Sequence, residues 1–524
     1  MSAIALVIIL YGTFQFLAAS MMTRRQTSTG IETHPAKVIS KSSRSDGSST
    51  NVHSNAATPI KQCDVVHFCF IVHGHKGKPT DLSYLHHAIK NNAKQQEEFT
   101  IIKSSSNCTL GGNDNLHNHI PGMDAREGNT SNNIDQKVGS SQTTLEGVTI
   151  NESSKDSAFI VHNAVCNEGL THDGIEKGGA RLAYEMLDVI RSELDSKTIK
   201  HKQDVTISIV GNSLGGLYGR YAVSIIDELL FASEEGDEMQ YYILDDNIHI
   251  YFNIFCSTAS PHLGCADRTY VSIPRIVELG IAKSLGQTGR DLFRVPPGTF
   301  WGPRQGCPND LIMAMATSPK FIRPLALFRK RIAYANVYGT DFVVPGSTAA
   351  FLDGNSDSLH YFNASVGSVR EGKAQRNEVN ACPASERGLL VASCYTKSLS
   401  LSDLGPAVNE MERMSKVLDS LGWTKVFVNI RKEILVSATM PSLKYADDCP
   451  IRRLSSKQHA ASSKDLCHAI SSAKDSRFIL PFGHNAMCAY ERGSFSTTFN
   501  KGGRPVMDSL AMNLVQDISL WTHA

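Results

Sequence analysis

No two cysteines of this chain stand in C-x-x-C spacing, although its 524 residues include 12 of them. Cysteine spacing therefore supports neither a zinc site nor a C-x-x-C redox centre. Cys69, Cys166 and Cys256 fall in apolar runs typical of strands, which favours buried free thiols. Clusters of lysine and arginine are missing, internal repeats are not evident, and the formal net charge is +1. Nucleic acid and strongly acidic partners are therefore not expected.

Charge is also missing from the first segment of the chain. Residues 2–22 carry no charged side chain, and residues 3–22 are mostly apolar. Such a run is about long enough to span a bilayer, and it also resembles a signal peptide that ends in small residues. Because the first basic side chains, Arg24 and Arg25, follow the apolar run, a membrane anchor is favoured over a cleaved signal or an organelle leader. We therefore predict membrane association through residues 1–22, with the topology open.

Composition divides the rest of the chain. Residues 23–60 are rich in Ser, Thr, Lys and Arg, which predicts a disordered linker. In residues 61–350, apolar strand patterns alternate with helical ones, which predicts an α/β fold with a doubly wound, mostly parallel sheet. An Asn-, Ser- and Gly-rich stretch at about 104–157 predicts a disordered insertion. Residues 351–524 are expected to complete the domain with its last strand, a polar insertion at 445–475 and a terminal helix at 506–521.

The stretch from Asp204 to Leu230 predicts a strand, a tight turn and a helix. Apolar residues alternate in its first part and recur with helical spacing in its second part. At the turn, Gly211, Ser213 and Gly215 fit G-x-S-x-G, the nucleophile elbow of α/β-hydrolases. A serine on such a turn has a strained backbone and needs neighbours without a bulky Cβ, which Gly211 and Gly215 provide. Gly216 lets the helix begin close to the sheet. The alternative is a structural glycine turn.

An upstream loop is a candidate for part of an oxyanion hole. The continuous apolar run at 65–72 predicts a buried parallel strand, and it leads directly into a loop that contains Gly74. Hydrolases of this class place a glycine-bearing loop after an early strand, where one backbone N–H contributes to the oxyanion hole. We therefore predict the backbone N–H groups of His75 and Leu214 as oxyanion donors. His73 is expected to shape the loop.

Chain order guides the search for an acid and a base. Serine is a weak nucleophile unless a base takes its proton, and a carboxylate orients that base. In α/β-hydrolases the three groups follow in the order Ser, Asp or Glu, His. Asp341 closely follows a predicted strand at 331–337, and Asp353 is the alternative acid. His484 follows the last predicted strand and is our candidate base. Weaker candidates for the base are His262, His468 and His523.

Six blocks resemble the lipase-like serine esterases of eukaryotes, a family of α/β-hydrolases. They are FIVHGHKGKPTDLSYL (70–85), CNEGLTHDGIEKGGARLAYEM (166–186), ISIVGNSLGGLYGRYAV (207–223), STASPHLGC (257–265), LGQTGRDLF (285–293) and YANVYGTDFVVPGSTA (334–349). The short segment GHN (483–485) resembles the one in which that family carries its histidine. Asn212 stands where the family usually has a histidine, at a position that is not catalytic.

The resemblance implies hydrolysis of a carboxylic ester, in a lipid, without a metal or an organic cofactor. Ser213 would be the nucleophile, with Asp341 and His484 completing a triad, and helices at about 265–330 would form a lid. The same triad could instead transfer the acyl group to another acceptor or cleave a thioester. A third reading is a non-catalytic, membrane-tethered lipid-binding module, in which the acid and the base would lie too far from the serine to form a relay.

Overall fold

A computed structural model of the chain describes residues 65–107, 157–194, 202–232, 240–268, 274–295, 310–337, 341, 344–363, 389–430, 450–472 and 483–521. The predicted anchor, the predicted linker and most of the predicted insertion at 104–157 lie outside the described residues. None of the described helices combines the length and the hydropathy that a membrane span needs.

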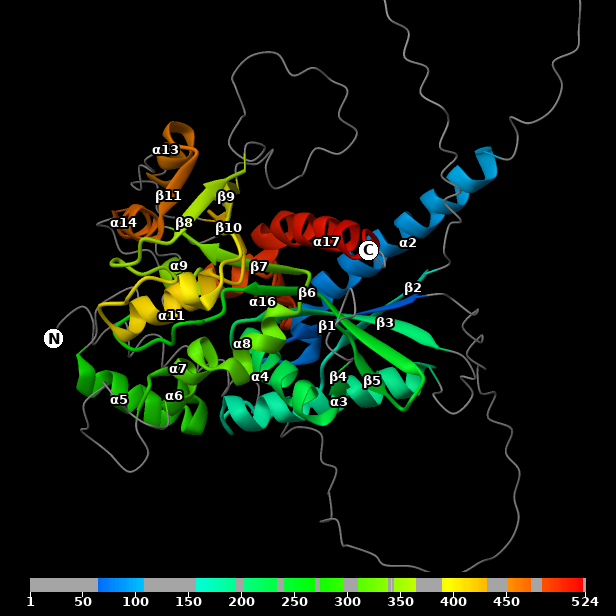
Figure 1. Cartoon of the computed structure of the whole chain (residues 1–524), viewed down its shortest axis with the longest axis horizontal. Coiled ribbons are helices and arrows are strands. Elements are labelled where there is room, and N and C mark those ends of the chain that lie inside the picture. The colour runs from blue at the N-terminus through cyan, green and yellow to red at the C-terminus, as the bar shows by residue number, and fades with distance from the viewer. Residues whose placement is uncertain are drawn as a thin grey trace, which may run out of the picture.

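The described strands form one mixed sheet of eleven, with a parallel centre (Figure 1). The parallel strands stand in the order β2 (Ser157–Asn163), β1 (Val65–Val72), β3 (Gln203–Asn212), β6 (Ile248–Thr258), β7 (Lys330–Asn336) and β10 (Thr424–Val428). The antiparallel strands are β9 (Leu390–Tyr395), β8 (Leu359–Phe362) and β11 (Ala460–Ser462) at one edge, and β5 (Tyr242–Leu244) and β4 (Phe231–Ala232) beside β6. The predicted fold class is confirmed.

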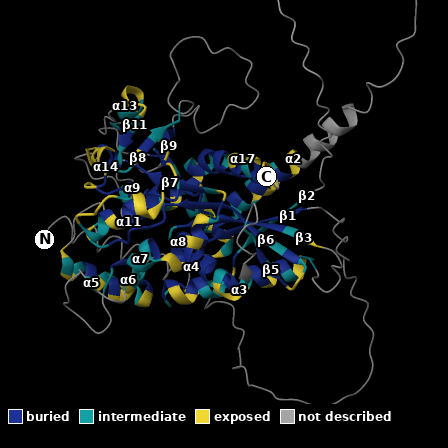
Figure 2. Ribbon diagram, viewed as in Figure 1, coloured by how far each residue is buried: buried dark blue, intermediate teal, exposed yellow. Residues whose placement is uncertain are grey.

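Helices cover both faces of this sheet. Phe68 and Phe70 of β1 belong to one apolar core, whereas Cys69 and Ile71 belong to another on the opposite face. The first core includes α3 (Ile175–Leu194) and α4 (Leu214–Leu229), and the second includes α2 (Ser83–Asn107) and α17 (Arg504–Ser519). Figure 2 shows the central strands as mostly buried. Burial on both faces explains why these strands are continuous apolar runs in the sequence.

The region at 265–330 contains short helices, as predicted. They are α5 (Arg275–Ser284), α6 (Gly286–Leu292), α7 (Leu311–Thr317) and α8 (Pro319–Ala326). α7 packs on α11 (Glu410–Asp419), and α8 packs on α4. α6 is tied to the start of α3, because the backbone N–H of Ile175 donates to the Asp291 carboxylate at 2.8 Å. A lid function for these helices stays a prediction.

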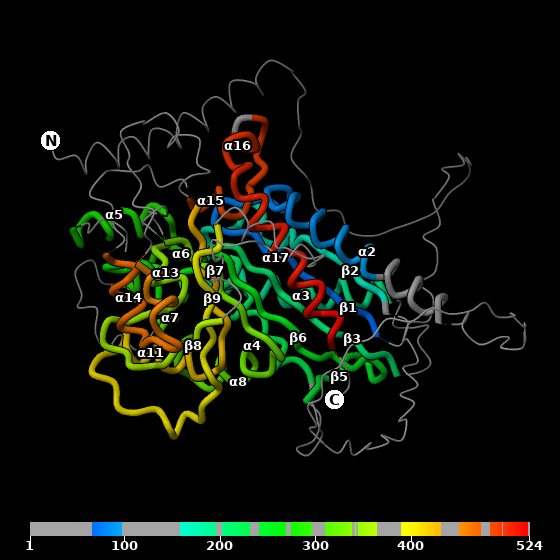
Figure 3. Tube along the Cα trace, turned by 90° about the horizontal axis from the view of Figure 1, so that it is seen from above, coloured from blue at the N-terminus to red at the C-terminus, as the bar shows by residue number. Residues whose placement is uncertain are grey.

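The C-terminal part has more regular structure than the sequence indicated. Residues within the polar insertion predicted at 445–475 form α13 (Pro450–Lys457), β11 and α14 (Ser463–Ser472), and β8 is a further regular element of this part. A third apolar core holds these elements, since Ala461 and Leu466 pack with Val391 and Cys394 of β9. Beyond them come α15 (Gly483–Met487) and α16 (Gly493–Asn500). α15 lies near the end of β7 and the start of α17 (Figure 3).

Candidate active site

Ser213 occupies a strained turn between β3 and α4. Its backbone angles are φ 54° and ψ −121°, although it is not a glycine. Such a conformation costs about 1–3 kcal/mol and persists only where the surroundings enforce it. The turn is fixed by a hydrogen bond from the Ser213 N–H to the carbonyl of Thr258, at 2.8 Å. Ser213 is partly exposed, whereas its neighbours Asn212 and Leu214 are buried.

Glycines are needed around this serine because other atoms occupy the space of a side chain. A Cβ on Gly211 would lie 2.4 Å from the Cα of Gly216, and a Cβ on Gly215 would lie 2.2 Å from the carbonyl oxygen of Val72. A Cβ on Gly216 would lie 2.1 Å from the Oγ of Ser260. These contacts bring α4 close to β1 and β6 and leave no room for alanine.

The loop after β1 lies directly against Ser213. A Cβ on Gly74 would come within 2.7 Å of the Ser213 Cβ and 3.2 Å of its Oγ. The loop closes with a hydrogen bond from the Gly77 N–H to the Gly74 carbonyl at 3.0 Å. His73 shapes it as well, since its Nδ1 lies 3.0 Å from the Gly74 carbonyl. Leu214, the residue after Ser213, begins α4, so its N–H has no acceptor within the helix.

The ring of His75 packs edge-on against the ring of His172, with centroids 4.7 Å apart. Burial, helped by the charges of His172 and Lys76, lowers the pKa of His75 to about 4. This side chain is therefore neutral near pH 7. His75 can contribute its backbone N–H to an oxyanion, but its ring adds no positive charge there.

Asp341 and His484 form a hydrogen-bonded pair. The Nδ1 of His484 lies 2.6 Å from the Oδ2 of Asp341, although 143 residues separate the two in sequence. The Asp341 side chain is buried, and its Oδ1 accepts a hydrogen bond from the Val344 N–H at 2.9 Å. Burial alone would lower the pKa of His484, but the Asp341 carboxylate outweighs it and raises the pKa above the ordinary value of 6.5. The carboxylate therefore both orients the ring and makes it a stronger base.

Ser213 follows the carboxyl end of β3 and Asp341 follows that of β7, the edge where α/β proteins build their sites. His484, on α15, meets this edge through its hydrogen bond to Asp341. Among the described residues, the hydrogen bonds of His484 include none to Ser213, and Nε2 is its available ring nitrogen. Catalytic contacts of this kind are often long without substrate and tighten when it binds. The structure thus brings the predicted acid and base into contact, and it places the predicted serine on a neighbouring loop of the same edge.

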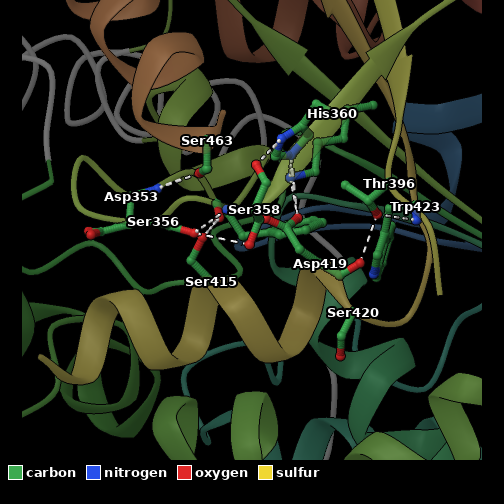
Figure 4. Close-up of polar contacts among 12 residues, drawn as sticks. Asp353, Ser356, Ser358, His360, Thr396, Ser415, Asp419, Ser420, Trp423 and Ser463 are labelled. Carbon is green, nitrogen blue, oxygen red and sulfur yellow. Dashed lines mark hydrogen bonds and ion pairs between the residues drawn. The ribbon is translucent and has the colours of Figure 1, made fainter. Parts of the chain in front are cut away.

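The alternative candidates have other partners. Asp353 pairs with Arg268 at 2.6 Å, and its backbone N–H donates to Ser463, as Figure 4 shows for the second contact. His262 is fully buried between Ser257 and Arg220. His468 is exposed on α14, and His523 lies outside the described residues.

Figure 4 also labels His360 and Asp419, two members of a buried charged cluster. The ammonium of Lys425 on β10 lies 2.5 Å from Asp419 Oδ1 and 2.8 Å from His360 Nε2. It also lies 3.9 Å from the centre of the Phe351 ring. Burial lowers the pKa of Lys425, while Asp419 opposes this shift. We interpret the cluster as a structural link between β8, β10 and the end of α11.

Comparison with known proteins found a matching family and a similar protein. Residues 127–351 match the family described as "Putative serine esterase (DUF676)". Over these residues the chain is similar to that family. The matched segment includes Ser213 and Asp341, whereas β1 and His484 lie outside the matched residues.

Over 202 residues, the chain is 31% identical to a Schizosaccharomyces pombe (strain 972) protein named "Putative lipase C4A8.10". The match covers 38% of this chain and 22% of that protein, so the chain spans about a fifth of its relative's length. No solved structure matches the chain significantly.

Three polar residues beneath the site were not identified as functional from the sequence. Asn212 ends β3, Thr258 ends β6 and Asn336 ends β7, so all three stand at the edge that carries the site. A polar residue that closes an apolar parallel strand is a signal that could have found them. Cys488, which contacts Asn212, gave no such signal, because a buried thiol is ordinary in a core.

Proposed function

We propose that this protein is a serine hydrolase that cleaves carboxylic esters of lipids with Ser213, His484 and Asp341. The 2.6 Å hydrogen bond between His484 and Asp341 is the observation that carries the proposal. A non-catalytic lipid-binding module has no need for an aspartate and a histidine paired across 143 residues beside a strained serine. The order Ser, Asp, His along the chain is also that of α/β-hydrolases.

In the proposed reaction, His484 Nε2 takes the proton of Ser213 Oγ as the oxygen attacks the acyl carbonyl carbon. Asp341 accepts the Nδ1–H bond and stabilises the imidazolium that forms. The N–H groups of His75 and Leu214 hold the developing oxyanion. His484 then protonates the departing alcohol, and the acyl group remains on Ser213. Water attacks this acyl-enzyme while His484 takes one of its protons. His484 then gives that proton to Ser213 Oγ as the bond to the acyl group breaks and the acid leaves.

The lipid part of the proposal rests on the S. pombe relative, whose name is that of a lipase. Lipid esters are met at membranes, and the apolar residues 3–22 would bring the enzyme to them. Separation of membranes from soluble protein would test this: the full chain is expected in the membrane fraction, and a variant lacking residues 1–22 is expected to leave it. Turnover of acyl esters of increasing chain length would define the substrate class.

A fluorophosphonate probe tests the nucleophile directly, because it bonds covalently to activated serines. The full chain is expected to label, Ser213→Ala is expected not to label, and Ser260→Ala serves as a matched control on a neighbouring serine. Folding of each variant is checked by circular dichroism. A folded wild-type protein that does not label, or labelling that persists in Ser213→Ala, would refute the proposal.

A further inference from the structure

Asn212 connects the serine turn to the segment that carries His484. Its side chain is buried, and its amide donates to Thr258 Oγ1 at 3.1 Å and to Cys488 Sγ at 2.7 Å. Cys488 follows α15, four residues after His484. The residue next to Ser213 therefore contacts the end of the short helix that begins with Gly483 and His484.

The other end of α15 is held in the same way. The side-chain amide of Asn336, the last residue of β7, donates to the carbonyl of Gly483 at 3.2 Å. Asn336 also precedes the loop that carries Asp341. Asn336 thus links the start of α15 to β7, the strand before Asp341. Asn212 links the end of α15 to β3, the strand before Ser213.

Cys488 takes part in this network as a neutral thiol. Burial raises its pKa to about 12, which leaves it protonated and unreactive near pH 7. The thiol can therefore donate its proton to Thr258 Oγ1, 3.4 Å away, while its sulfur accepts from Asn212. Each partner has a complementary role, so the contact is a satisfied structural link rather than a redox site.

We propose that Asn212 is a positioning residue, whose amide holds α15 through Cys488 so that His484 stays within reach of Ser213. The proposal rests on the proposed function, since positioning has a kinetic effect only if His484 is the base. A helix of five residues has too few internal hydrogen bonds to hold its own place. Its two asparagine contacts, together with the bond to Asp341, therefore help to set where the imidazole lies.

The positioning role of Asn212 is tested by the kinetics of variants at Asn212 and at Cys488, the two ends of the contact. A misplacement of about 1 Å can cost about 100-fold in rate. We therefore expect Asn212→Ala and Cys488→Ala each to lower kcat by about 10- to 100-fold with KM unchanged. The rate of fluorophosphonate labelling should fall by the same factor. Cys488→Ser, which keeps a donor and an acceptor, should restore most of the rate. Asn92→Ala, which removes a side-chain contact to Ala88 on α2, is the control and should behave as wild type.

Double-mutant cycles separate this role from a general loss of stability. If Asn212 and Cys488 act through one contact, the double variant is no slower than the slower single variant. If Asn212 acts through His484, the double variant Asn212→Ala with His484→Ala has the same kcat as His484→Ala alone. Wild-type kcat in folded Asn212→Ala, or effects that multiply in either double variant, would overturn the proposal.

Hydrogen exchange of the backbone amides is a second measurement, and it does not depend on catalytic activity. Backbone amides of residues 483–490 should exchange faster in Asn212→Ala and in Cys488→Ala than in wild type, while those of α17 remain protected. Unchanged exchange at 483–490 would overturn the link even if labelling falls. A wild-type protein that does not label would instead refute the proposed function, and exchange would still decide whether Asn212 holds α15.

Discussion

Arg492 and Asp81 form a two-point ion pair although 411 residues separate them in sequence. The Nε of Arg492 donates to Asp81 Oδ1 at 3.0 Å, and its Nη2 donates to Asp81 Oδ2. The same Nη2 also donates to the carbonyl of Lys76 at 2.7 Å. Asp81 is buried and follows the loop after β1, and Arg492 follows α15. The pair therefore joins the loop beside Ser213 to the segment that carries His484.

Arg492→Ala should destabilise the protein, because it leaves the buried Asp81 carboxylate without its cationic partner. We expect the free energy of unfolding to fall by about 1.5–3 kcal/mol, measured by urea denaturation. Arg504→Ala is the matched control. Arg504 pairs with Glu491 at 2.9 Å, but both side chains are partly exposed, so its loss should cost less than about 1 kcal/mol. Equal effects of the two substitutions would contradict this expectation.

The pH dependence of turnover should reveal the pair of His484 and Asp341. Since Asp341 raises the pKa of His484, kcat/KM should begin to fall at a higher pH than an ordinary histidine would give. Asp341→Asn should lower kcat by about 100-fold or more and move the acid limb to lower pH. An acid limb that does not move would show that Asp341 leaves the ionisation of His484 unchanged.

The same pair should affect stability in a definite direction. The pKa of His484 is higher in the folded protein than its ordinary value of 6.5. Its contribution to the free energy of unfolding is therefore complete below pH 6.5 and is lost as pH rises through the raised pKa. Urea denaturation across this window, compared between wild type and His484→Gln, measures the contribution. A difference that grows with rising pH would contradict the assigned direction.

Gly74→Ala should lower the reactivity of Ser213 more than it lowers the stability of the fold. The new Cβ would press on the Cβ and Oγ of Ser213, so the serine or the loop must shift. A shift of about 1 Å predicts a loss of about 100-fold in the rate of fluorophosphonate labelling. Gly354→Ala is the control, because among the described residues, apart from its two chain neighbours, no atom lies within 4 Å of its Cβ position. Similar labelling rates in the two variants would show that the contact has no effect on the serine.

Lys425→Met should destabilise the fold, because it leaves the buried carboxylate of Asp419 without its ammonium partner. Breaking a buried pair in this way costs about 3–5 kcal/mol. The double variant Lys425→Met with Asp419→Leu should recover part of that loss, since no buried charge then remains unpaired. Urea denaturation of the three proteins checks both expectations. A double variant less stable than Lys425→Met would contradict the explanation.

Strands covered on both faces were the easiest elements to predict. The apolar runs that form β1 and β6 are continuous because each alternating side chain enters a core. β8, β9 and β11 were not predicted. They are short, they lie at the antiparallel edge, and partners distant in sequence hold them. β11, for example, is only Ala460–Ser462, too few residues to show a period.

For the candidate site, the sequence indicated the nucleophile, the acid and the base, but not the residues that hold them. Gly211 and Gly215 indicated Ser213 because the sterics of the turn are local, and chain order indicated Asp341 and His484. The contacts of Asn212 could not be predicted in this way. Its partner Cys488 lies 276 residues further on, and only the folded sheet edge brings the two together.

The packing of α17 on α2 has a consequence for the synthesis of this protein. Leu82, Leu85 and Ile89 are buried in the core that α17 helps to form. On the ribosome these side chains emerge some four hundred residues before Val506 and Leu510. At about 5–20 residues per second, translation leaves that face uncovered for tens of seconds. This apolar face of the nascent chain therefore stays exposed to water until α17 has been synthesised, and it can be buried only after α17 has left the exit tunnel.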